Sequence, residues 1–539
     1  MPNLGSFLQV LLLTASVATG ASCRPNSQLP IVDLGYNIQQ ASSFNASGKY
    51  YNFSNIAYAE PPLGDLRFAA PVSPHTNRSS IKNGNFQVTC TQAIPFWFAE
   101  GLFGAPDLPP NPAQSEDCLF LDVFVPQQVF DGPKGKGKGA AVLVWIHGGG
   151  LLLGSKTGND PAGLIAKAQA KAQRDGMIIV MLNYRLGAFG WLGGPDFTKQ
   201  HGTDNAGLLD QRLALEWVQE HITKFGGDPE RVTVIGESAG AASIVHHLTA
   251  YGGDECEAPP FQQAVIQSPA WTVAPTAGFK DAEFKNLLKT ANVTSLQQLR
   301  ALDSATLIKI NNEIVHSGAT GTFPFGGSIF VDGTYVTAPP AQLLLNGKFD
   351  KKVKAVIGIN SDEGLVFTPQ NETTAKDFNF KSYVKANIPT ITDSALKFVT
   401  ETLYPPPGPK TPYSNDNARA ILFTGELVVY CHETVLSTAM HNQTHVYEFS
   451  VPPGVHVEDV AFTFFNGPNP QVASPAVAET MQGFISEFAL TGNPNGKGLP
   501  EFPVYGHVNV LNLTLSGYPL VKDPHSNERC AYLQQALFG

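Results

Sequence analysis

Ser238 has the surroundings of a serine that acts as a nucleophile. It stands in the middle of the run GESAG, residues 236–240, which fits the pattern G-x-S-x-G. An apolar, β-branched run at 232–235 precedes it, and a helix-compatible stretch at 241–253 follows. A sharp turn from strand to helix holds such a serine out toward solvent, and the flanking glycines leave room for the turn. The alternative is that this serine only caps the helix.

An earlier glycine run has the residues that such a nucleophile needs as hydrogen-bond donors. A histidine and three glycines, residues 147–150, directly follow the apolar run 141–146. Loops of this type point backbone N–H groups at the oxygen that becomes negatively charged when a serine attacks a carbonyl group. We therefore expect Gly149, Gly150 and Ala239 to form an oxyanion hole. The run alone would indicate a flexible turn, but its place after a strand upstream of the serine favours the hole.

Two adjacent carboxylates, Asp362 and Glu363, stand in a loop after the apolar run 353–359. A serine hydroxyl needs a histidine to accept its proton, and the histidine needs a carboxylate to orient it. In hydrolases with this kind of turn, the order along the chain is serine, acid, histidine. One of the two carboxylates is therefore the expected acid. The residues themselves do not choose between them, and a solvated turn is the alternative.

His456 is the histidine best placed to accept the proton. It follows the apolar run 445–451 and the sequence Pro452-Pro453-Gly454, so we expect it in a loop just past the end of a strand. A single histidine is more often structural than catalytic, so its position decides. Five other histidines follow the acidic loop, in a helix-like stretch, at the wrong end of the strand or near the C-terminus: His432, His441, His445, His507 and His525.

The elements around these candidates predict an α/β fold. Helical patterns separate the strand-like runs, and the clearest, residues 207–225, has a broad apolar face and stops at Gly226 and Gly227. Alternating strands and helices predict a large, mainly parallel sheet flanked by helices, with ligands bound at the carboxyl ends of the strands. The runs expected as strands buried on both faces are 141–146, 177–182, 232–235, 264–266, 353–359 and 445–451.

Composition narrows the function classes further. The chain has 539 residues, 43% of them hydrophobic, without internal repeats, so we expect residues 21–539 to form a single catalytic domain. Only 15% of the residues are charged and the net charge is −10, which argues against a nucleic-acid partner. We find no phosphate loop and no convergent set of zinc ligands, so neither a cofactor nor a metal is expected.

The N-terminus predicts secretion. An apolar run at residues 7–17 precedes the small residues Ala18 and Gly20, which indicates a signal peptide over residues 1–20. The run is too short to span a bilayer, and Gly, Pro or a charge interrupts every later apolar run, so no membrane span is expected. In a secreted chain, Asn-x-Ser/Thr sequons predict glycans on exposed loops. Seven begin at Asn45, Asn52, Asn77, Asn292, Asn371, Asn442 and Asn512.

With these motifs in this order, the chain resembles the type-B carboxylesterase/lipase family, which includes the cholinesterases and secreted fungal lipases. Three further stretches match the family, residues 59–68, 115–119 and 183–187, and the resemblance covers nearly the whole mature chain. It implies the α/β-hydrolase fold and a serine hydrolase that cleaves carboxylic esters, with a small-molecule or lipid ester as substrate.

The resemblance also implies roles for single residues. Ser238 is the implied nucleophile, His456 the base, and Glu363 rather than Asp362 the acid. Six cysteines allow fifteen complete pairings, and the family pattern implies two disulfides. These are Cys90–Cys118 and Cys431–Cys530.

The chain departs from the family in its remaining cysteines. No second cysteine lies near Cys256 to close the family's usual short loop, so Cys256 either pairs with Cys23 or both are free.

The loop of about residues 90–118 contains an apolar, aromatic run at 94–103. In lipases of the family this loop is a lid that could contact a lipid interface; the alternative is permanent packing on the domain. Residues 107–109 lack the choline-binding tryptophan of cholinesterases, which disfavours choline esters.

An alternative function comes from the same family, which includes cholinesterase-like adhesion modules that bind partners without hydrolysing a substrate. Such modules typically lack the serine. Here Ser238, Glu363, His456 and the glycine loop are all present, which favours a secreted carboxylesterase or lipase. The acyl and alcohol preferences and the oligomeric state depend on the shape of the active-site gorge and carry no prediction.

Overall fold

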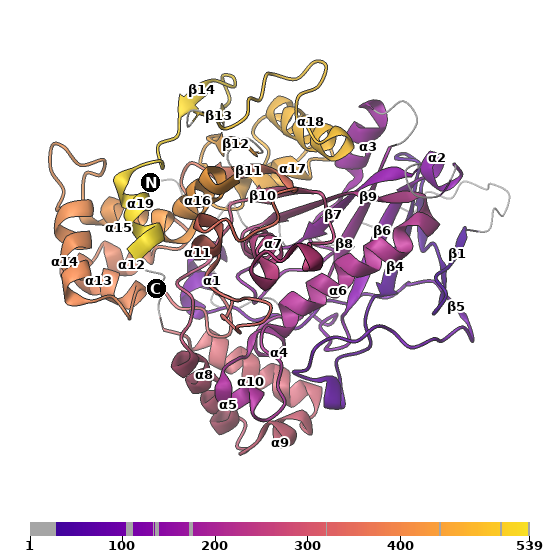
Figure 1. Ribbon diagram of the computed structural model, residues 1–539, viewed down its shortest axis with the longest axis horizontal. Coiled ribbons are helices and arrows are strands. Elements are labelled where there is room, and N and C mark those ends of the chain that lie inside the picture. Colours follow the sequence, from indigo (N-terminus) through magenta and orange to yellow (C-terminus); the bar gives the residue numbers. More distant parts are fainter. Residues whose placement is uncertain are drawn as a thin grey trace.

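A twisted sheet with helices on both faces forms the centre of the chain (Figure 1). The computed structural model describes residues 29–103, 111–132, 134, 139–171, 176–319, 321–440, 444–506 and 509–536. Within these residues eleven strands hydrogen-bond side by side. From one edge to the other they are β14 (Leu520–Lys522), β13 (Asn509–Leu513), β12 (Thr444–Phe449), β11 (Lys354–Asn360), β10 (Gln263–Gln267), β9 (Gly227–Glu237), β7 (Ala140–Ile146), β8 (Met177–Leu182), β6 (Phe120–Pro126), β4 (Tyr50–Ala57) and β3 (Ser43–Asn45).

The strands from β13 across to β8 run parallel, and the edge strands run antiparallel. All six predicted runs correspond to strands, β7 to β12, with residue 353 before the start of β11 and residues 450–451 beyond the end of β12. Every residue of β7, β8 and β12 is buried, as expected for strands covered by helices on both faces. The predicted α/β fold with a mainly parallel sheet is therefore confirmed. A separate small sheet contains β1 (Ile31–Asp33), β2 (Ile38–Gln40) and β5 (Ile81–Lys82).

Two sets of helices cover the sheet (Figure 1). On one face, α3 (Ala162–Lys171), α17 (Glu458–Thr463) and α18 (Pro475–Thr491) bury their apolar side chains in one hydrophobic cluster. On the other face, α6 (Ala206–His221), α7 (Ala239–Leu248) and α16 (Cys431–Met440) contribute to a larger cluster. The predicted helix at 207–225 is α6 followed by the 3₁₀ turn η3 (Ile222–Phe225), and Gly226 ends it with a positive φ of 91°.

The remaining helices lie at the carboxyl ends of the strands and around the rim. One group, α5 (Pro195–Thr198), α8 (Ala277–Thr290), α9 (Leu296–Arg300) and α10 (Ser304–His316), packs around a third hydrophobic cluster. Another group, α13 (Phe380–Asn387), α14 (Asp393–Phe398) and α15 (Asp416–Gly425), packs around a fourth. The other helices are η2 (Gly64–Leu66), α1 (Phe96–Phe103), α2 (Gln127–Phe130), α4 (Ala188–Trp191), η4 (Ala250–Gly252), η5 (Glu255–Glu257), α11 (Pro340–Leu345), α12 (Gln370–Thr373), η6 (Val399–Leu403), η7 (Glu426–Tyr430) and α19 (Glu528–Ala536).

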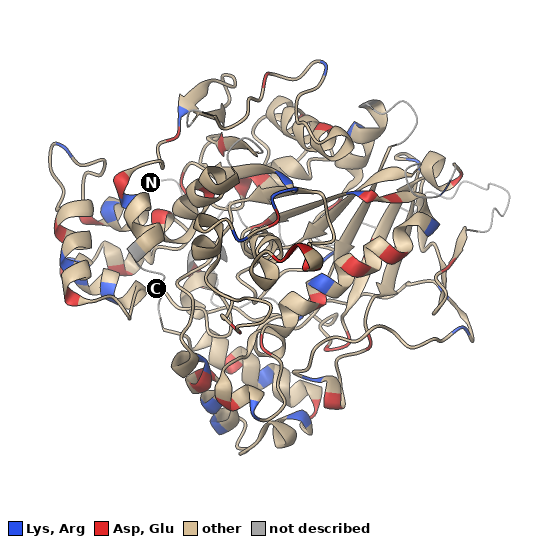
Figure 2. Cartoon of the chain, viewed as in Figure 1, with Lys and Arg blue, Asp and Glu red and all other residues tan. Residues whose placement is uncertain are grey.

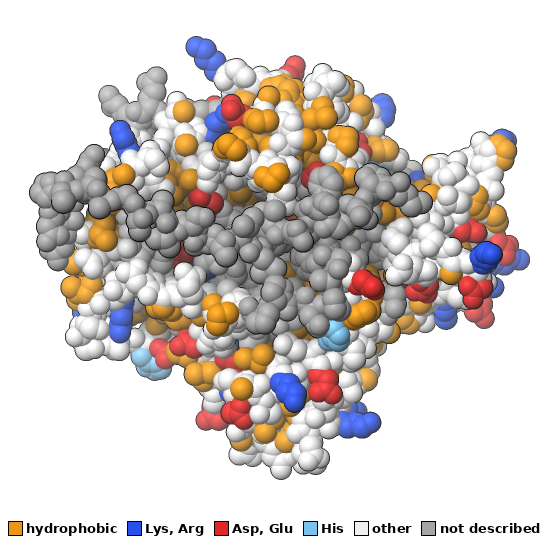
Figure 3. Space-filling model, turned by 180° about the vertical axis from the view of Figure 1, so that it is seen from behind, with side chains coloured by type: hydrophobic (Ala, Val, Ile, Leu, Met, Phe, Trp, Pro, Cys, Tyr) orange, Lys and Arg blue, Asp and Glu red, His pale blue; other side chains and the backbone are white. Residues whose placement is uncertain are grey.

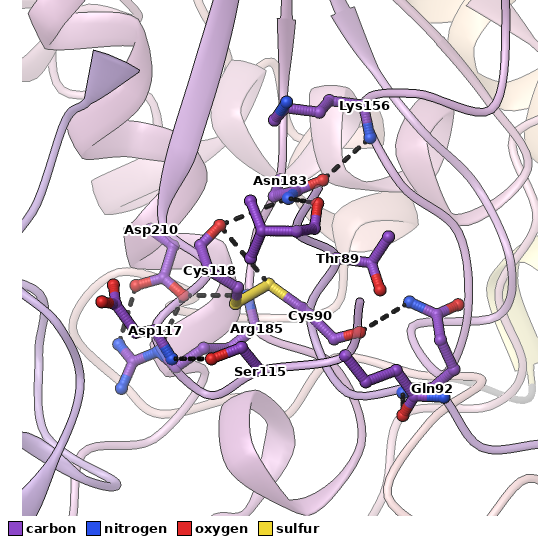
Figure 4. The surroundings of a disulfide bond; sticks show 12 residues. Thr89, Cys90, Gln92, Ser115, Asp117, Cys118, Lys156, Asn183, Arg185 and Asp210 are labelled. Carbon is purple, nitrogen blue, oxygen red and sulfur yellow. Dashed lines mark hydrogen bonds and ion pairs between the residues drawn. A yellow bond between two sulfur atoms is a disulfide. The ribbon is translucent and has the colours of Figure 1, made fainter. Parts of the chain in front are cut away.

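Two disulfides link distant parts of the chain, Cys90–Cys118 and Cys431–Cys530. Figure 4 shows the buried polar surroundings of the first. Nδ2 of Asn183 donates to the carbonyl oxygen of Cys118. Cys256 is exposed and forms no disulfide with any described residue, whereas Cys23 lies outside the described residues.

The surface carries charges of both signs. Figure 2 shows acidic and basic side chains on the outer helices and few on the central strands, and the view from behind shows both signs along the rim (Figure 3). In the described part of the chain, no helix is long and apolar enough to cross a membrane. The predicted signal peptide, residues 1–20, and the sequon at Asn442 lie outside the described residues.

Candidate active site

Ser238 sits at the tip of a sharp turn between β9 and α7. Its backbone has φ 56° and ψ −123°, a conformation that costs energy for a residue with a side chain and that fixes the serine's direction. The turn depends on its glycines. A Cβ atom on Gly240 would lie 2.1 Å from the carbonyl oxygen of Ile146, and one on Gly236 would lie 2.7 Å from the backbone of Gly240. Backbone packs directly on backbone here, so only glycine fits.

Ser238, His456 and Glu363 form a continuous hydrogen-bonded chain. Nε2 of His456 lies 2.8 Å from Oγ of Ser238, and Nδ1 lies 2.5 Å from Oε2 of Glu363. The exposed fractions of the three residues are 6%, 3% and 0%, so water competes little with these contacts. Each residue follows the carboxyl end of its own strand, β9, β12 or β11. The structure therefore brings together three residues that sequence reasoning proposed for one site.

The structure separates the two adjacent carboxylates. Asp362 donates its backbone N–H to the carbonyl oxygen of Gly454 at 2.7 Å, and its side chain is not among the contacts of His456. Glu363 turns inward, where Oε1 accepts hydrogen bonds from Oγ of Ser268 at 2.6 Å and from the backbone N–H of Asn360 at 2.7 Å. Oε2 of Glu363 remains for the histidine. Glu363, not Asp362, is thus in place to orient His456.

The other candidate histidines, where the structure describes them, make packing and backbone contacts typical of structural residues. His432 stacks on Trp271 with ring centroids 3.6 Å apart, and His525 stacks on Tyr430 at 3.7 Å. His445 lies at the start of β12, where its ring contacts the backbone carbonyl oxygens of residues 502 and 503. The other two, His441 and His507, lie outside the described residues.

The glycine loop after β7 lies against the serine turn. A Cβ atom on Gly148 would lie 2.6 Å from the carbonyl oxygen of Glu237 and 3.0 Å from Cβ of Ser238, so the two segments are in backbone contact. Gly149 and Gly150 both have positive φ, 105° and 62°, which aims their peptide groups in directions that other residues rarely allow. Ala239, the third predicted donor, is the first residue of α7.

Glu237 places a second carboxylate beside the histidine. Its Oε1 lies 3.3 Å from Nε2 of His456 and has no hydrogen-bond partner among the described residues. Burial raises the pKa of Glu237 above its usual range. Burial lowers the pKa of His456, but the carboxylates of Glu237 and Glu363 outweigh it and raise that pKa above its usual value. The histidine is therefore held ready to carry a positive charge.

Sequence reasoning missed the buried polar residues that hydrogen-bond to Glu363 and to its neighbours. Ser268 follows β10, the strand between β9 and β11, and donates to Glu363. Nδ2 of Asn360 donates to Oγ of Ser268 at 3.0 Å and also contacts Asp459. Asp459 in turn accepts a hydrogen bond from the hydroxyl group of Tyr447 at 2.7 Å. One signal was present, since a polar residue directly after a buried strand of a parallel sheet lies at its functional edge.

Aromatic side chains form one wall beside the triad. The ring of Phe367 lies 4.7 Å from that of His456, and Phe98 of α1 stacks on Phe367 with centroids 6.2 Å apart. Phe323 contacts Phe98 at 5.1 Å and lies beside Gly150, whose added Cβ would be 3.7 Å from the Phe323 ring. The aromatic run predicted within the disulfide-closed loop thus reaches the active site. Residues 104–110 of that loop lie outside the described residues.

The described residues contain no group of histidine, cysteine and carboxylate side chains arranged to hold a metal ion. The chemistry available at this site is that of a buried serine, a histidine and two carboxylates beside backbone N–H groups. Such a set can form and break an acyl bond on the serine.

Known proteins share this architecture. A model of the carboxylesterase family matches residues 38–533. The carboxylesterase patB of Aspergillus clavatus is 42% identical over 98% of this chain and 100% of its own length, and that of Penicillium expansum is 40% identical over 95% and 97%. Among solved structures, Aspergillus niger EstA aligns with a TM-score of 0.78 at 26% identity, covering 94% of this chain and 98% of EstA. The chain therefore belongs to the carboxylesterase family and is a carboxylic ester hydrolase.

Proposed function

We propose that the chain cleaves carboxylic esters through an acyl-enzyme on Ser238. The observation that carries the proposal is the hydrogen-bonded chain from Oγ of Ser238 through His456 to Glu363, set in a strained turn. Oγ attacks the ester carbonyl carbon while Nε2 of His456 takes its proton. The imidazolium then gives that proton to the departing alcohol, and water attacks the acyl-enzyme by the same steps.

The oxygen that becomes negatively charged needs donors close to the serine. We assign this role to the backbone N–H groups of Gly149, Gly150 and Ala239. The glycine loop and the serine turn are in backbone contact, which supports the assignment. Removing one donor of such a hole costs about 10²–10³ in turnover, so these N–H groups contribute a large share of the catalysis.

Hydrolysis of p-nitrophenyl esters from acetate to palmitate tests this function. The secreted protein is expected to hydrolyse at least part of the series, and Ser238→Ala is expected to reduce its activity by several orders of magnitude. The control is Ser317→Ala, at an exposed serine after α10. If Ser238→Ala retains activity, Ser238 is not the nucleophile and the proposed mechanism is wrong. If the folded wild type hydrolyses none of the esters, either its substrate is a narrow one outside this series or a non-catalytic, cholinesterase-like binding module becomes the better explanation.

We propose that the segment around α1 acts as a lid whose outer side contacts a lipid interface. Phe96 is 43% exposed, whereas Phe98, two residues later, packs in the aromatic wall beside His456. One short helix therefore has an aromatic side chain on the surface and another at the active site. This arrangement supports lipid esters as substrates in addition to small soluble esters.

The lid proposal predicts a difference between dissolved and emulsified esters. Phe96→Ser is expected to lower activity on an emulsified triglyceride while activity on dissolved p-nitrophenyl acetate stays unchanged, because only the emulsion requires surface contact. Phe279→Ser is the matched control, since Phe279 is 56% exposed on α8, a helix outside the loop that Cys90 and Cys118 close. Equal losses on both substrates, or equal effects of both variants, would contradict the proposal.

We also propose that the protein is secreted after removal of residues 1–20. The apolar N-terminal run and the sequons support this route. Mass spectrometry of the protein from the culture medium should give an N-terminus at Ala21. An intracellular product that keeps residues 1–20 would exclude secretion through this peptide.

A further inference from the structure

Tyr430 contacts the backbone of Glu363 from a helix that sequence reasoning did not connect with the active site. The backbone N–H of Glu363 donates to the hydroxyl oxygen of Tyr430 at 2.9 Å. Tyr430 is the last residue of η7, a π-helical segment that joins α15 directly to α16. π-helical segments within α-helices are frequent at functional sites, because their extra residue redirects the side chains that follow.

The loop that carries Glu363 is docked tightly on this helix. A Cβ atom on Gly364 would lie 1.9 Å from the carbonyl oxygen of Ile421, in α15. A Cβ atom on Gly425 would lie 3.1 Å from the backbone nitrogen of Gly364 and 2.7 Å from the ring of Tyr430. Two glycines thus let the loop and the helix meet backbone to backbone. A shift of the helix at the junction of α15 and η7 would therefore move Glu363.

The C-terminal segment holds the same helix in place through three different contacts. His525 stacks on the ring of Tyr430 with centroids 3.7 Å apart and planes inclined by 8°. Arg529 forms an ion pair of 2.7 Å with the fully buried carboxylate of Glu426, the first residue of η7. The disulfide Cys431–Cys530 joins Cys431, the residue directly after Tyr430, to Cys530 in α19. These contacts fix both ends of the π-helical segment.

We infer that Tyr430 is a positioning residue for the triad carboxylate and that the C-terminal segment, residues 523–530, keeps Tyr430 in position. The inference rests on the proposed function, in which Glu363 orients His456. Burial raises the pKa of Tyr430, so its hydroxyl stays neutral and keeps its place as the acceptor. Without that oxygen the buried N–H of Glu363 has no acceptor, and the loop shifts to satisfy it.

The consequence is a looser hydrogen bond between Glu363 and His456. The carboxylate then stabilises the imidazolium less, and formation of the acyl-enzyme slows. A displacement of about 1 Å in a catalytic group can cost about 10²-fold in rate. Loss of the Tyr430 hydroxyl leaves the side-chain contacts of Glu363 with Ser268 and Asn360 in place, so we expect a smaller effect, about tenfold.

Tyr430→Phe tests the inference because it removes only the hydroxyl oxygen. Its kcat/KM and its pre-steady-state acylation rate per titrated active site are expected to fall about tenfold. The acid limb of its pH profile is expected to move to lower pH. His456, which that limb reports, faces Glu237, Glu363 and Asp459, and the variant weakens only the contact with Glu363. A loss of thermal stability with an unchanged acylation rate and pH profile would overturn the inference.

Tyr383→Phe is the matched control. Tyr383, in α13, is also buried, and its hydroxyl group hydrogen-bonds Oγ1 of Thr424 at 2.7 Å. Thr424 lies in α15, which continues into the segment that carries Tyr430, but Tyr383 contacts no residue of the triad. We expect its thermal stability to fall while its acylation rate and pH profile stay those of the wild type. If both variants slow acylation equally, the effect is general packing and Tyr430 has no special role.

A second pair of variants tests the part played by the C-terminal segment. His525→Ala removes the ring that stacks on Tyr430, and His525→Phe keeps an aromatic ring there. The alanine variant is expected to slow acylation in the same direction as Tyr430→Phe, and the phenylalanine variant is expected to restore it. If alanine leaves acylation unchanged, or phenylalanine fails to restore it, the C-terminal segment does not position Tyr430. Failure of the proposed function itself would appear separately, as a wild type without Ser238-dependent hydrolysis.

Discussion

Oε1 of Glu237 lies 3.3 Å from Nε2 of His456, the nitrogen that also contacts Oγ of Ser238. The residue next to the nucleophile thus carries a buried carboxylate that faces the general base. A negative charge at this distance in a buried site favours the protonated imidazole, and with Glu363 it outweighs the effect of burial on the pKa of His456.

Glu237→Gln should therefore extend activity to lower pH. Protonated His456 cannot accept the serine's proton, so kcat/KM rises with pH as His456 loses its proton. Removing the carboxylate of Glu237 lowers the pKa of His456, and the acid limb of the profile should move down by about one pH unit. Asp362→Asn, in the acidic loop but out of contact with His456, should leave the limb in place. A limb that is unchanged in Glu237→Gln would show that Glu237 is uncharged in the range of that limb.

Gly240→Ala should disrupt the serine turn, because the new Cβ atom would lie 2.1 Å from the carbonyl oxygen of Ile146. Backbone has to move, so we expect a loss of about 1–3 kcal/mol or more in the free energy of unfolding, together with a strong fall in kcat/KM. Gly278→Ala, in α8, meets no atom within 4 Å and should stabilise the protein by up to about 1 kcal/mol. Thermal unfolding and ester hydrolysis measure both effects. Similar behaviour of the two variants would argue against backbone contact at the turn.

His432 should make stability depend on pH. Burial lowers its pKa in the folded protein from 6.5 to about 3. The unfolded chain therefore binds a proton first as the pH falls, so the contribution of the neutral His432 is complete above pH 6.5 and declines steadily toward pH 3. His432→Phe does not titrate, and at pH 7 it should be less stable than the wild type because it loses its contact with the carbonyl oxygen of Pro269.

The free energy of unfolding of the wild type exceeds that of His432→Phe at pH 7, and this difference should narrow by about 2 kcal/mol between pH 7 and pH 5. Denaturant unfolding at the two pH values measures it. Tyr383→Phe exchanges one uncharged side chain for another, so its difference from the wild type in unfolding free energy should be the same at both pH values. A difference in unfolding free energy that stays constant would mean that folding does not lower the pKa of His432.

The sequons should differ in occupancy according to their exposure. Asn371 is exposed in the short helix α12, whereas Asn512 lies within β13 and its Oδ1 is buried. A glycan on Nδ2 of Asn512 would begin next to this buried oxygen, in a half-buried residue of a strand that pairs on both sides, with β12 and β14. Asn371→Gln should therefore lower the mass of the purified protein by one glycan, and Asn512→Gln should leave it unchanged apart from the substitution. Mass spectrometry after glycosidase treatment supplies the control, and a glycan found on Asn512 would refute the argument.

The strands could be predicted from sequence because helices cover both faces of the sheet, which makes each strand an uninterrupted apolar run. Ser238, Glu363 and His456 could be proposed for the same reason, since each follows such a run within a few residues. The local sequence could not decide whether Asp362 or Glu363 is the acid, because both lie in one turn. The fold decides it by pairing Asp362 with Val455, which leaves Glu363 turned inward.

Other parts of the site depend on contacts between segments far apart in the chain. Phe98, Phe323 and Phe367 come from three separate segments of the chain, and no local pattern indicates that their rings meet. Tyr430 reaches Glu363 because a π-helical segment interrupts an otherwise regular helix. The sequence there is compatible with an unbroken α-helix, so tertiary packing determines where this segment forms.

The triad spans more than two hundred residues, from the end of β9 to the loop after β12, and β10 must pair between β9 and β11 to supply Ser268. Contacts so distant in sequence form slowly, because long loops must close before they bring any gain. During synthesis, a chain that has emerged only as far as β11 has its nucleophile but no base. Esterase activity should therefore appear abruptly and late in the folding of each molecule, so it can serve as a reporter of completed assembly.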